Sequence, residues 1–135
     1  MQLKDRVAII TGSSRGIGKG IALSCAAERA KVVINYKSDR NSALETAKEI
    51  NINGGESIII KADITKHTQV KNMVNKTIDK FGTIDILVNN AGIHDFDDFS
   101  SYNAEKVLKR MINTHLYGSF YCTQSVIKEM KKNNR

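Results

Sequence analysis

A glycine-rich turn between a short apolar run and a helix-forming segment constrains this chain more than any other feature. The apolar run is Val7–Ile10, and the turn spans Thr11 to Gly18 in the pattern Thr-Gly-x-x-x-Gly-x-Gly. Glycine permits a tight turn, a close approach of the backbone to a pyrophosphate, and close packing of helix on strand. The N-terminus of the following helix offers free N–H groups to phosphates. The turn therefore predicts a dinucleotide site.

A phosphate-binding loop of the nucleoside triphosphatase kind is the main alternative for such a turn. That loop ends in Gly-Lys followed by Ser or Thr, whose hydroxyl binds magnesium. Here Gly20 follows Lys19, so the hydroxyl is missing. A plain strand-to-helix turn is the other alternative. It is disfavoured because a second apolar run closes a strand–helix–strand unit, which is the context that a dinucleotide site requires.

The order of elements along the chain predicts the fold. Further apolar runs lie at Val32–Ile34, Ile58–Ile60 and Ile86–Val88, and continuous runs of this kind indicate strands buried on both faces. Segments between them have helical periodicity, and a last stripe predicts a helix from about Ala104 to Lys132. Strict alternation predicts a Rossmann-like, doubly wound α/β fold with a parallel sheet in a three-layer αβα arrangement. We expect one domain over residues 1–135.

The net charge and the cysteine content limit the classes of partner and the cellular location that we expect for this chain. The formal net charge is +7, and the densest basic group, Lys128, Lys131, Lys132 and Arg135, stands at the end of the last predicted helix, where cations favour the helix dipole. No nucleic-acid-binding motif accompanies it, so we expect a solvated surface and no nucleic-acid partner. The two cysteines lie far apart, which favours free thiols and a cytoplasmic location. The apolar runs are too short for a signal peptide or a membrane span.

The end of the second predicted strand bears on the choice of cofactor. An NAD-binding site places an acid there for the ribose 2′-hydroxyl. The strand instead ends in Asn35, Tyr36 and Lys37, with Arg40 beyond and Arg15 in the glycine turn. Basic groups pair with a 2′-phosphate, so the sequence favours NADP(H) over NAD(H). Asp39 would reverse the preference if its loop brought it to the ribose.

Two further motifs make the chain similar to a known family. Asp63-Ile64 follows the third predicted strand, and Asn89-Asn90-Ala91-Gly92 follows the fourth. With the glycine turn, they resemble the short-chain dehydrogenases/reductases of the classical type, the branch of 3-oxoacyl-acyl-carrier-protein reductases and sugar dehydrogenases. The resemblance covers the whole chain but only the N-terminal half of the family's length, so we expect a domain incomplete at its C-terminus.

The resemblance implies hydride transfer between a nicotinamide cofactor and a small carbonyl or alcohol substrate. It implies that Asn89 ties neighbouring strands together. It assigns cofactor contacts in three groups: Gly12, Ser14, Arg15, Gly16, Ile17 and Gly18 at the phosphates and ribose, Asp63 and Ile64 at the adenine, and Asn90, Ala91 and Gly92 at the nicotinamide ribose. It also implies homo-oligomers formed through the 104–132 helix.

The resemblance places the catalytic Ser, Tyr and Lys beyond Arg135, so we expect this stretch alone to be inactive. A non-catalytic nucleotide-binding fragment is therefore the alternative function. Tyr102 and Lys106 have the right mutual spacing, but they come too soon after Gly92 and are interpreted as an exposed loop and an ordinary helical pair.

His115 departs from the family pattern. The family has Asn-Leu-x-Gly-x-Phe on its long helix, with Asn as a fourth catalytic residue, whereas this chain begins the pattern with His115. The histidine is a candidate catalytic residue, able to carry a proton or to replace the Asn in another way. A core histidine on an apolar stripe is the open alternative. His94 with Asp95, Asp97 and Asp98 is interpreted as a solvated loop, and no metal site is expected.

Overall fold

The computed structural model describes residues 1–94 and 97–133. Asp95 and Arg135, which entered the interpretation of the sequence, lie outside the described residues. The elements in chain order are β1 (Val7–Ile10), α1 (Gly16–Ala27), β2 (Lys31–Tyr36), α2 (Arg40–Ile52), β3 (Glu56–Lys61), α3 (His67–Phe81), β4 (Ile86–Val88), α4 (Ala104–Ile112), the π-helical turn η1 (Asn113–Gly118) and α5 (Ser119–Asn133).

The four strands form one parallel sheet in the order β3-β2-β1-β4. The predicted Rossmann-like sheet is confirmed. β1 and β4 have the predicted bounds, whereas β2 and β3 are longer than their apolar runs. They are longer because Lys31 and Tyr36 pair with Glu56 and Lys61, so the backbone ladder continues where polar side chains begin.

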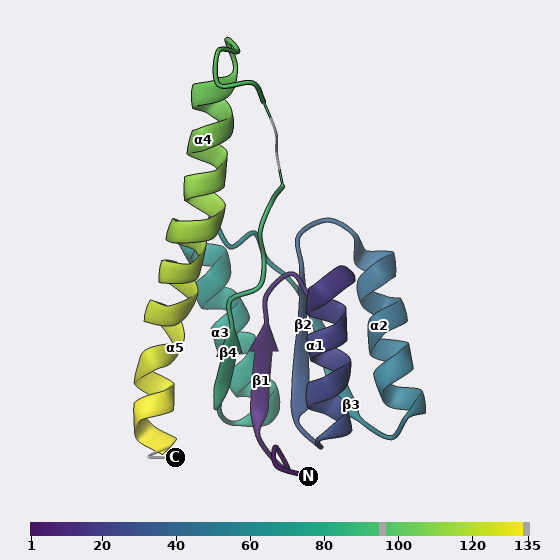
Figure 1. The fold of residues 1–135 in the computed structure, drawn as a ribbon. Helices are drawn as coiled ribbons and strands as arrows, with labels where there is room; N and C mark the ends of the chain where they lie inside the picture. The colour runs from purple at the N-terminus through teal and green to yellow at the C-terminus, as the bar shows by residue number, and fades with distance from the viewer. Residues whose placement is uncertain (95–96, 134–135) are drawn as a thin grey trace.

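Helices cover both faces of the sheet, which confirms the three-layer arrangement (Figure 1). Alternate strand residues divide between two cores. Ile9 and Val33 belong to the core shared with α3 and α5, whereas Ala8 and Ile10 belong to the core shared with α1 and α2. The apolar runs of β1 and β2 are therefore buried on both faces, as their composition indicated, whereas the edge strand β4 and most of the edge strand β3 are only partly buried.

The predicted long helix is present, with a π-helical turn inside it. α4, η1 and α5 follow one another without a break, and α4 projects beyond the carboxyl edge of the sheet (Figure 1). Gly118 closes the turn and is buried. A Cβ at Gly118 would lie 2.6 Å from Cδ1 of Ile64, so this glycine lets the helix approach the end of β3 closely.

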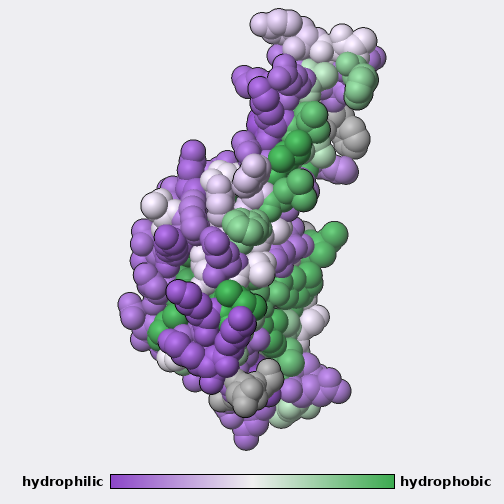
Figure 2. Space-filling model, turned by 90° about the vertical axis from the view of Figure 1, so that its left-hand side faces the viewer, coloured by the Kyte–Doolittle hydropathy of each residue, from purple (hydrophilic) through white to green (hydrophobic). Residues whose placement is uncertain are grey.

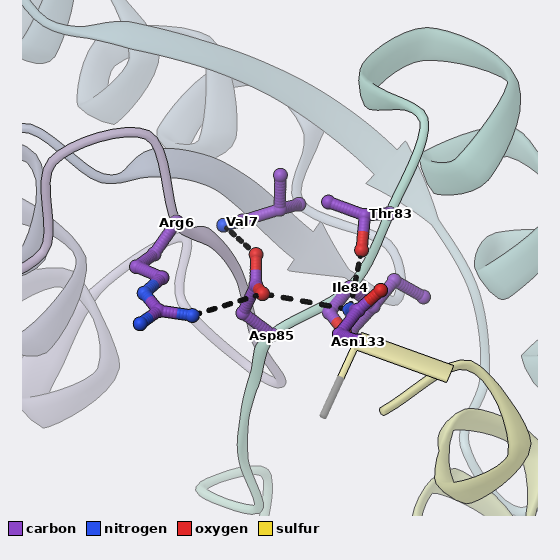
Figure 3. Close-up of polar contacts among 6 residues, drawn as sticks. All are labelled: Arg6, Val7, Thr83, Ile84, Asp85 and Asn133. Carbon is purple, nitrogen blue, oxygen red and sulfur yellow. Dashed lines mark hydrogen bonds and ion pairs between the residues drawn. The ribbon is translucent and has the colours of Figure 1, made fainter. Parts of the chain in front are cut away.

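A polar cluster joins the other end of the sheet to the end of α5 (Figure 3). The Asp85 carboxylate accepts hydrogen bonds from the backbone N–H of Val7 at 3.0 Å and from Arg6 at 3.4 Å. The Asn133 amide donates to Thr83, to the carbonyl of Ile84 at 3.0 Å and to Asp85 at 3.4 Å. The cluster therefore connects β1, the segment before β4 and the last turn of α5.

Within the described residues, no helix combines the length and the apolar character that a membrane crossing requires. The same part of the chain holds no group of three or more His, Cys, Asp or Glu side chains placed to bind a metal ion.

Candidate functional site

A pocket of about 420 Å³ opens at the carboxyl edge of the sheet, where β1 adjoins both β2 and β4. Ligands of open α/β folds bind at this edge, where the direction of the chain connections changes. All of the cofactor residues predicted from the sequence line the pocket except Ile17 and Gly18. Ile17 is 78% exposed, and Gly18 is buried beneath the turn.

The glycine turn adopts a backbone conformation that residues with side chains rarely adopt. Gly12 and Gly16 have φ values of +62° and +60°, in the left-handed region. A Cβ at Gly12 would lie 2.9 Å from the Cα of Ala91. α1 begins at Gly16 with no acidic residue in its first turn, so its N-terminus presents N–H groups and positive potential to the pocket.

Thr11 and Asn90 fix the turn to the end of β4. The Thr11 hydroxyl accepts from the backbone N–H groups of Asn90 at 3.0 Å and Ala91 at 2.9 Å. The Asn90 amide donates to the carbonyls of Thr11 at 3.0 Å and Gly12 at 3.2 Å. The prediction that Asn89 ties the strands is therefore wrong. Its amide points the other way and donates to Thr123 on α5, because neighbouring strand-end residues point to opposite sides.

Asn35 supports the turn from β2. Its side-chain oxygen accepts from the Gly12 N–H at 3.1 Å, and its amide nitrogen donates to the carbonyls of Ile60 at 3.3 Å and Ala62 at 3.2 Å. The residue is 2% exposed. Asn35 lines the pocket, but its side chain is engaged within the protein, joining the glycine turn to the end of β3.

The rim beside β2 combines exposed cations with engaged carboxylates. Asp39 accepts from the Ser42 hydroxyl at 2.6 Å and the Ser42 N–H at 3.1 Å, and so caps α2. These bonds, together with the positive charge of Arg15, lower the pKa of Asp39. The Lys37 side chain is mostly exposed, and its Nζ lies 3.8 Å from Oδ2 of Asp63. The Tyr36 hydroxyl accepts from Arg40 at 3.3 Å.

Asp63 lies at the end of β3 in a local turn. Partial burial opposes ionisation of its carboxyl group, but the hydrogen bonds from the hydroxyl and N–H of Thr65 and the charges of Lys37 and Lys66 outweigh it and lower the pKa. Asp63 therefore presents a carboxylate, which accepts hydrogen bonds. Thr65 also lines the pocket and was missed, although an Asp two residues before a Thr is a recognisable turn signal.

The long helix contributes the last wall. Thr114, in the π-helical turn, lines the pocket together with Gly92 and Ile93, and it was not predicted because nothing in the sequence indicated the turn. His115 is not a lining residue, but its Nε2 lies 3.0 Å from the Ile93 oxygen and 3.3 Å from the Ile93 nitrogen. Tyr102 is 99% exposed and lines no part of the pocket, as its interpretation as a loop residue requires.

Comparison with known proteins agrees with this geometry. A family model described as short chain dehydrogenase matches residues 6–135. The chain belongs to the short chain dehydrogenase family. The family resemblance stated from three motifs is thereby confirmed, and the fold is the one expected of it.

This chain has named relatives that are described as a dehydrogenase and a reductase. It is 35% identical over 132 residues to glucose 1-dehydrogenase 2 of Bacillus subtilis, covering 98% of this chain and 51% of that protein. It is 41% identical over 138 residues to the 3-oxoacyl-[acyl-carrier-protein] reductase of Synechocystis, covering 96% of this chain and 52% of that protein. The chain thus spans about half the length of the curated relatives it matches.

Solved structures are also similar to nearly all of this chain and to about half of their own length. A mutant of a Serratia marcescens short-chain dehydrogenase/reductase superposes with a TM-score of 0.91 at 32% identity, over 96% of this chain and 53% of that one. A hydroxysteroid dehydrogenase from Escherichia coli gives a TM-score of 0.89 at 34% identity, over 97% and 55% of the two chains. The short chain dehydrogenase fold therefore extends through nearly all of the described residues.

Proposed function

We propose that this short chain dehydrogenase binds NADP(H) and serves hydride transfer between the nicotinamide and a carbonyl or alcohol substrate. The observation that carries the proposal is the pocket at the carboxyl edge of the sheet. The glycine turn and the N-terminus of α1 suit the pyrophosphate, and the carboxylate of Asp63 suits the adenine amino group. Asn90, Ala91 and Gly92 are then left for the nicotinamide ribose.

The rim beside β2 supports NADP(H) over NAD(H). Arg15 and Lys37 line this part of the pocket and are exposed, so they can reach a 2′-phosphate. Asp39, the acid that would favour NAD(H), also lines the rim, but both of its oxygens accept hydrogen bonds from Ser42. The carboxylate of Asp39 is thereby held at the N-terminus of α2.

Removing the two cations tests this preference. We expect Arg15→Gln with Lys37→Gln to weaken NADPH binding by about 10- to 100-fold, the effect of losing one or two charge-assisted hydrogen bonds, and NADH binding by less than about threefold. Fluorescence titration of both nucleotides measures the two affinities. Lys76→Gln, an exposed lysine of α3, is the control. Equal losses for NADPH and NADH would assign the cations to the pyrophosphate instead.

Nucleotide binding without turnover is the second candidate function. At the Gly92–Thr114 end of the pocket, the described lining residues bring no tyrosine hydroxyl together with a lysine. Oxidation of NADPH in the presence of a panel of keto compounds separates the candidates. Steady consumption would exclude the binding-only function, and tight binding without consumption would support it.

We propose a second copy of this chain as the partner of the long helix. Along α4 and η1, Leu108 is 56% exposed and Leu116 is 65% exposed, and Phe120 at the start of α5 is 56% exposed. Figure 2 shows hydrophobic side chains in a band along the projecting helix. Two such bands buried against each other would remove a continuous apolar patch from water.

A charge in this band should separate the copies. We expect Leu116→Lys to convert a dimer or larger oligomer to a monomer, because two buried ammonium groups would face an apolar partner. Sedimentation velocity measures the mass. Leu44→Lys, on α2 at the opposite layer, is the control, since Leu44 is also partly exposed but lies outside the band. An unchanged oligomer in Leu116→Lys would exclude this interface.

The thiols support a reducing, cytoplasmic setting, which we propose as the location. Cys25 and Cys122 are both free. Burial raises the pKa of Cys122 to about 11, so the thiolate that oxidants attack is scarce at neutral pH.

A further inference from the structure

One ring nitrogen of His115 faces both backbone groups of Ile93. Nε2 lies 3.3 Å from the Ile93 nitrogen and 3.0 Å from the Ile93 oxygen. A ring nitrogen carries either a proton, which it donates, or a lone pair, which accepts. His115 therefore satisfies the N–H of Ile93 or its carbonyl, but not both at once.

The same ring packs against Gly92. A Cβ added to Gly92 would lie 2.5 Å from Cε1 of His115 and 3.2 Å from its Nδ1. Gly92 and Ile93 both line the pocket, and Thr114 lines it from the neighbouring position on the helix. A shift of the imidazole ring is thus transmitted to two consecutive pocket residues without the ring itself entering the pocket.

We propose that His115 is a positioning residue that holds the Gly92–Ile93 corner in two alternative hydrogen-bonded states, selected by the tautomer of its ring. With the proton on Nε2, the ring donates to the Ile93 carbonyl. With the proton on Nδ1, Nε2 accepts from the Ile93 N–H. The corner borders the end of the pocket that takes the nicotinamide under the proposed function, on which this inference rests. His115 acts through the corner and carries no proton to substrate.

Asparagine and leucine distinguish positioning from packing. An asparagine amide has a donor and an acceptor on separate atoms, so it can serve both groups of Ile93. Leucine fills similar space and serves neither. The nucleotide 2′,5′-ADP contains the adenine and the 2′-phosphate but no nicotinamide, so its affinity reports the rest of the pocket alone.

We expect His115→Leu to weaken NADPH binding about tenfold, the factor for one ordinary hydrogen bond, and to leave 2′,5′-ADP binding within about twofold of the wild type. His115→Asn should restore NADPH binding. Calorimetry with both nucleotides, on the whole 135-residue chain, measures these affinities. Equal NADPH affinity in wild type and His115→Leu would overturn the proposal, as would failure of His115→Asn to restore binding.

A double-mutant cycle tests the contact with Gly92. Gly92→Ala should weaken NADPH binding in the wild type because its methyl group displaces the imidazole. The same change should have a smaller effect in His115→Ala, where the space is empty. Equal effects in both backgrounds would show that the ring does not transmit the change and would contradict the proposal.

The wild-type protein provides a readout that no substitution can disturb. We expect the ¹⁵N shifts of the His115 ring nitrogens to report both tautomers in the free protein and one in the NADPH complex. A single tautomer, unchanged by NADPH, would overturn the two-state corner. Failure of the proposed function has a different signature, since the wild type would then bind neither NADPH nor 2′,5′-ADP.

Discussion

Gly18→Ala should abolish nucleotide binding and lower the stability of the protein, although it adds only one methyl group. A Cβ at Gly18 would collide with the carbonyl oxygen of Gly12 and lie 2.5 Å from the Asn90 amide nitrogen and 2.9 Å from Cα of Ser13. Two of these neighbours are backbone atoms of the glycine turn, and the third is the side chain that ties the turn to β4. Relief of the clash therefore requires the phosphate-binding turn to move.

We expect overpacking at Gly18 to cost about 1–3 kcal/mol in the free energy of unfolding. Gly20→Ala is a matched control in the same helix. Nothing lies within 4 Å of its added Cβ, and alanine is favoured over glycine in a helix by about 1 kcal/mol. Denaturant unfolding and NADPH titration of both variants test the argument. If both variants behave alike, close packing beneath the turn is not what Gly18 provides.

Asp85→Ala should be the most destabilising change at the other end of the sheet. The Asp85 side chain is 3% exposed and holds the Val7 N–H, Arg6 and Asn133 together (Figure 3). Its loss leaves the N–H of Val7 and the partly buried Arg6 and Asn133 side chains without this acceptor. We expect a cost of about 2–3 kcal/mol, less than for a fully buried ion pair, because the Arg6 side chain is partly exposed and regains some hydration. The midpoint of thermal unfolding should fall by about 10 °C.

Glu49→Ala is the comparison for Asp85→Ala. The Glu49 carboxylate lies 2.8 Å from Nζ of Lys19, whereas the Asp85 carboxylate lies 3.4 Å from Nη1 of Arg6. The Glu49 and Lys19 side chains are, however, 46% and 33% exposed. Exposed pairs contribute about 0–1 kcal/mol, so burial and not distance should decide the order. A loss for Glu49→Ala equal to that for Asp85→Ala would contradict this ranking.

Most of the fold could be predicted because short apolar runs and helical periodicity, which are local sequence patterns, indicate its strands and helices. The continuous apolar runs at Val7–Ile10 and Ile86–Val88 gave the bounds of β1 and β4 to the residue. β2 and β3 were underestimated because Lys31 and Lys61 pair through their backbones, which side-chain polarity does not reveal.

The site was less predictable because its details depend on contacts distant in the sequence. Asn35 was expected at the cofactor, and only the fold shows that β3 carbonyls and the Gly12 N–H use its side chain. Asn89 and Asn90 are adjacent and chemically identical, so nothing local assigned the tying role to Asn90. Thr114 reaches the pocket through a π-helical turn that no residue pattern announced.

The π-helical turn η1 divides the long helix into α4 and α5, and it rotates one relative to the other about the helix axis, compared with an uninterrupted α-helix. A π-helical turn holds about one residue more than an α-helical turn, and one residue corresponds to about 100° around a helix axis. α5 is fixed by its packing on the sheet through Cys122 and Val126, so the direction in which α4 faces depends on the residues between them. Leu108 and Phe120 therefore cannot be drawn on one helical wheel. The outward-facing surface of α4 can consequently be reoriented by a change of one residue in length, while the core beneath α5 stays as it is.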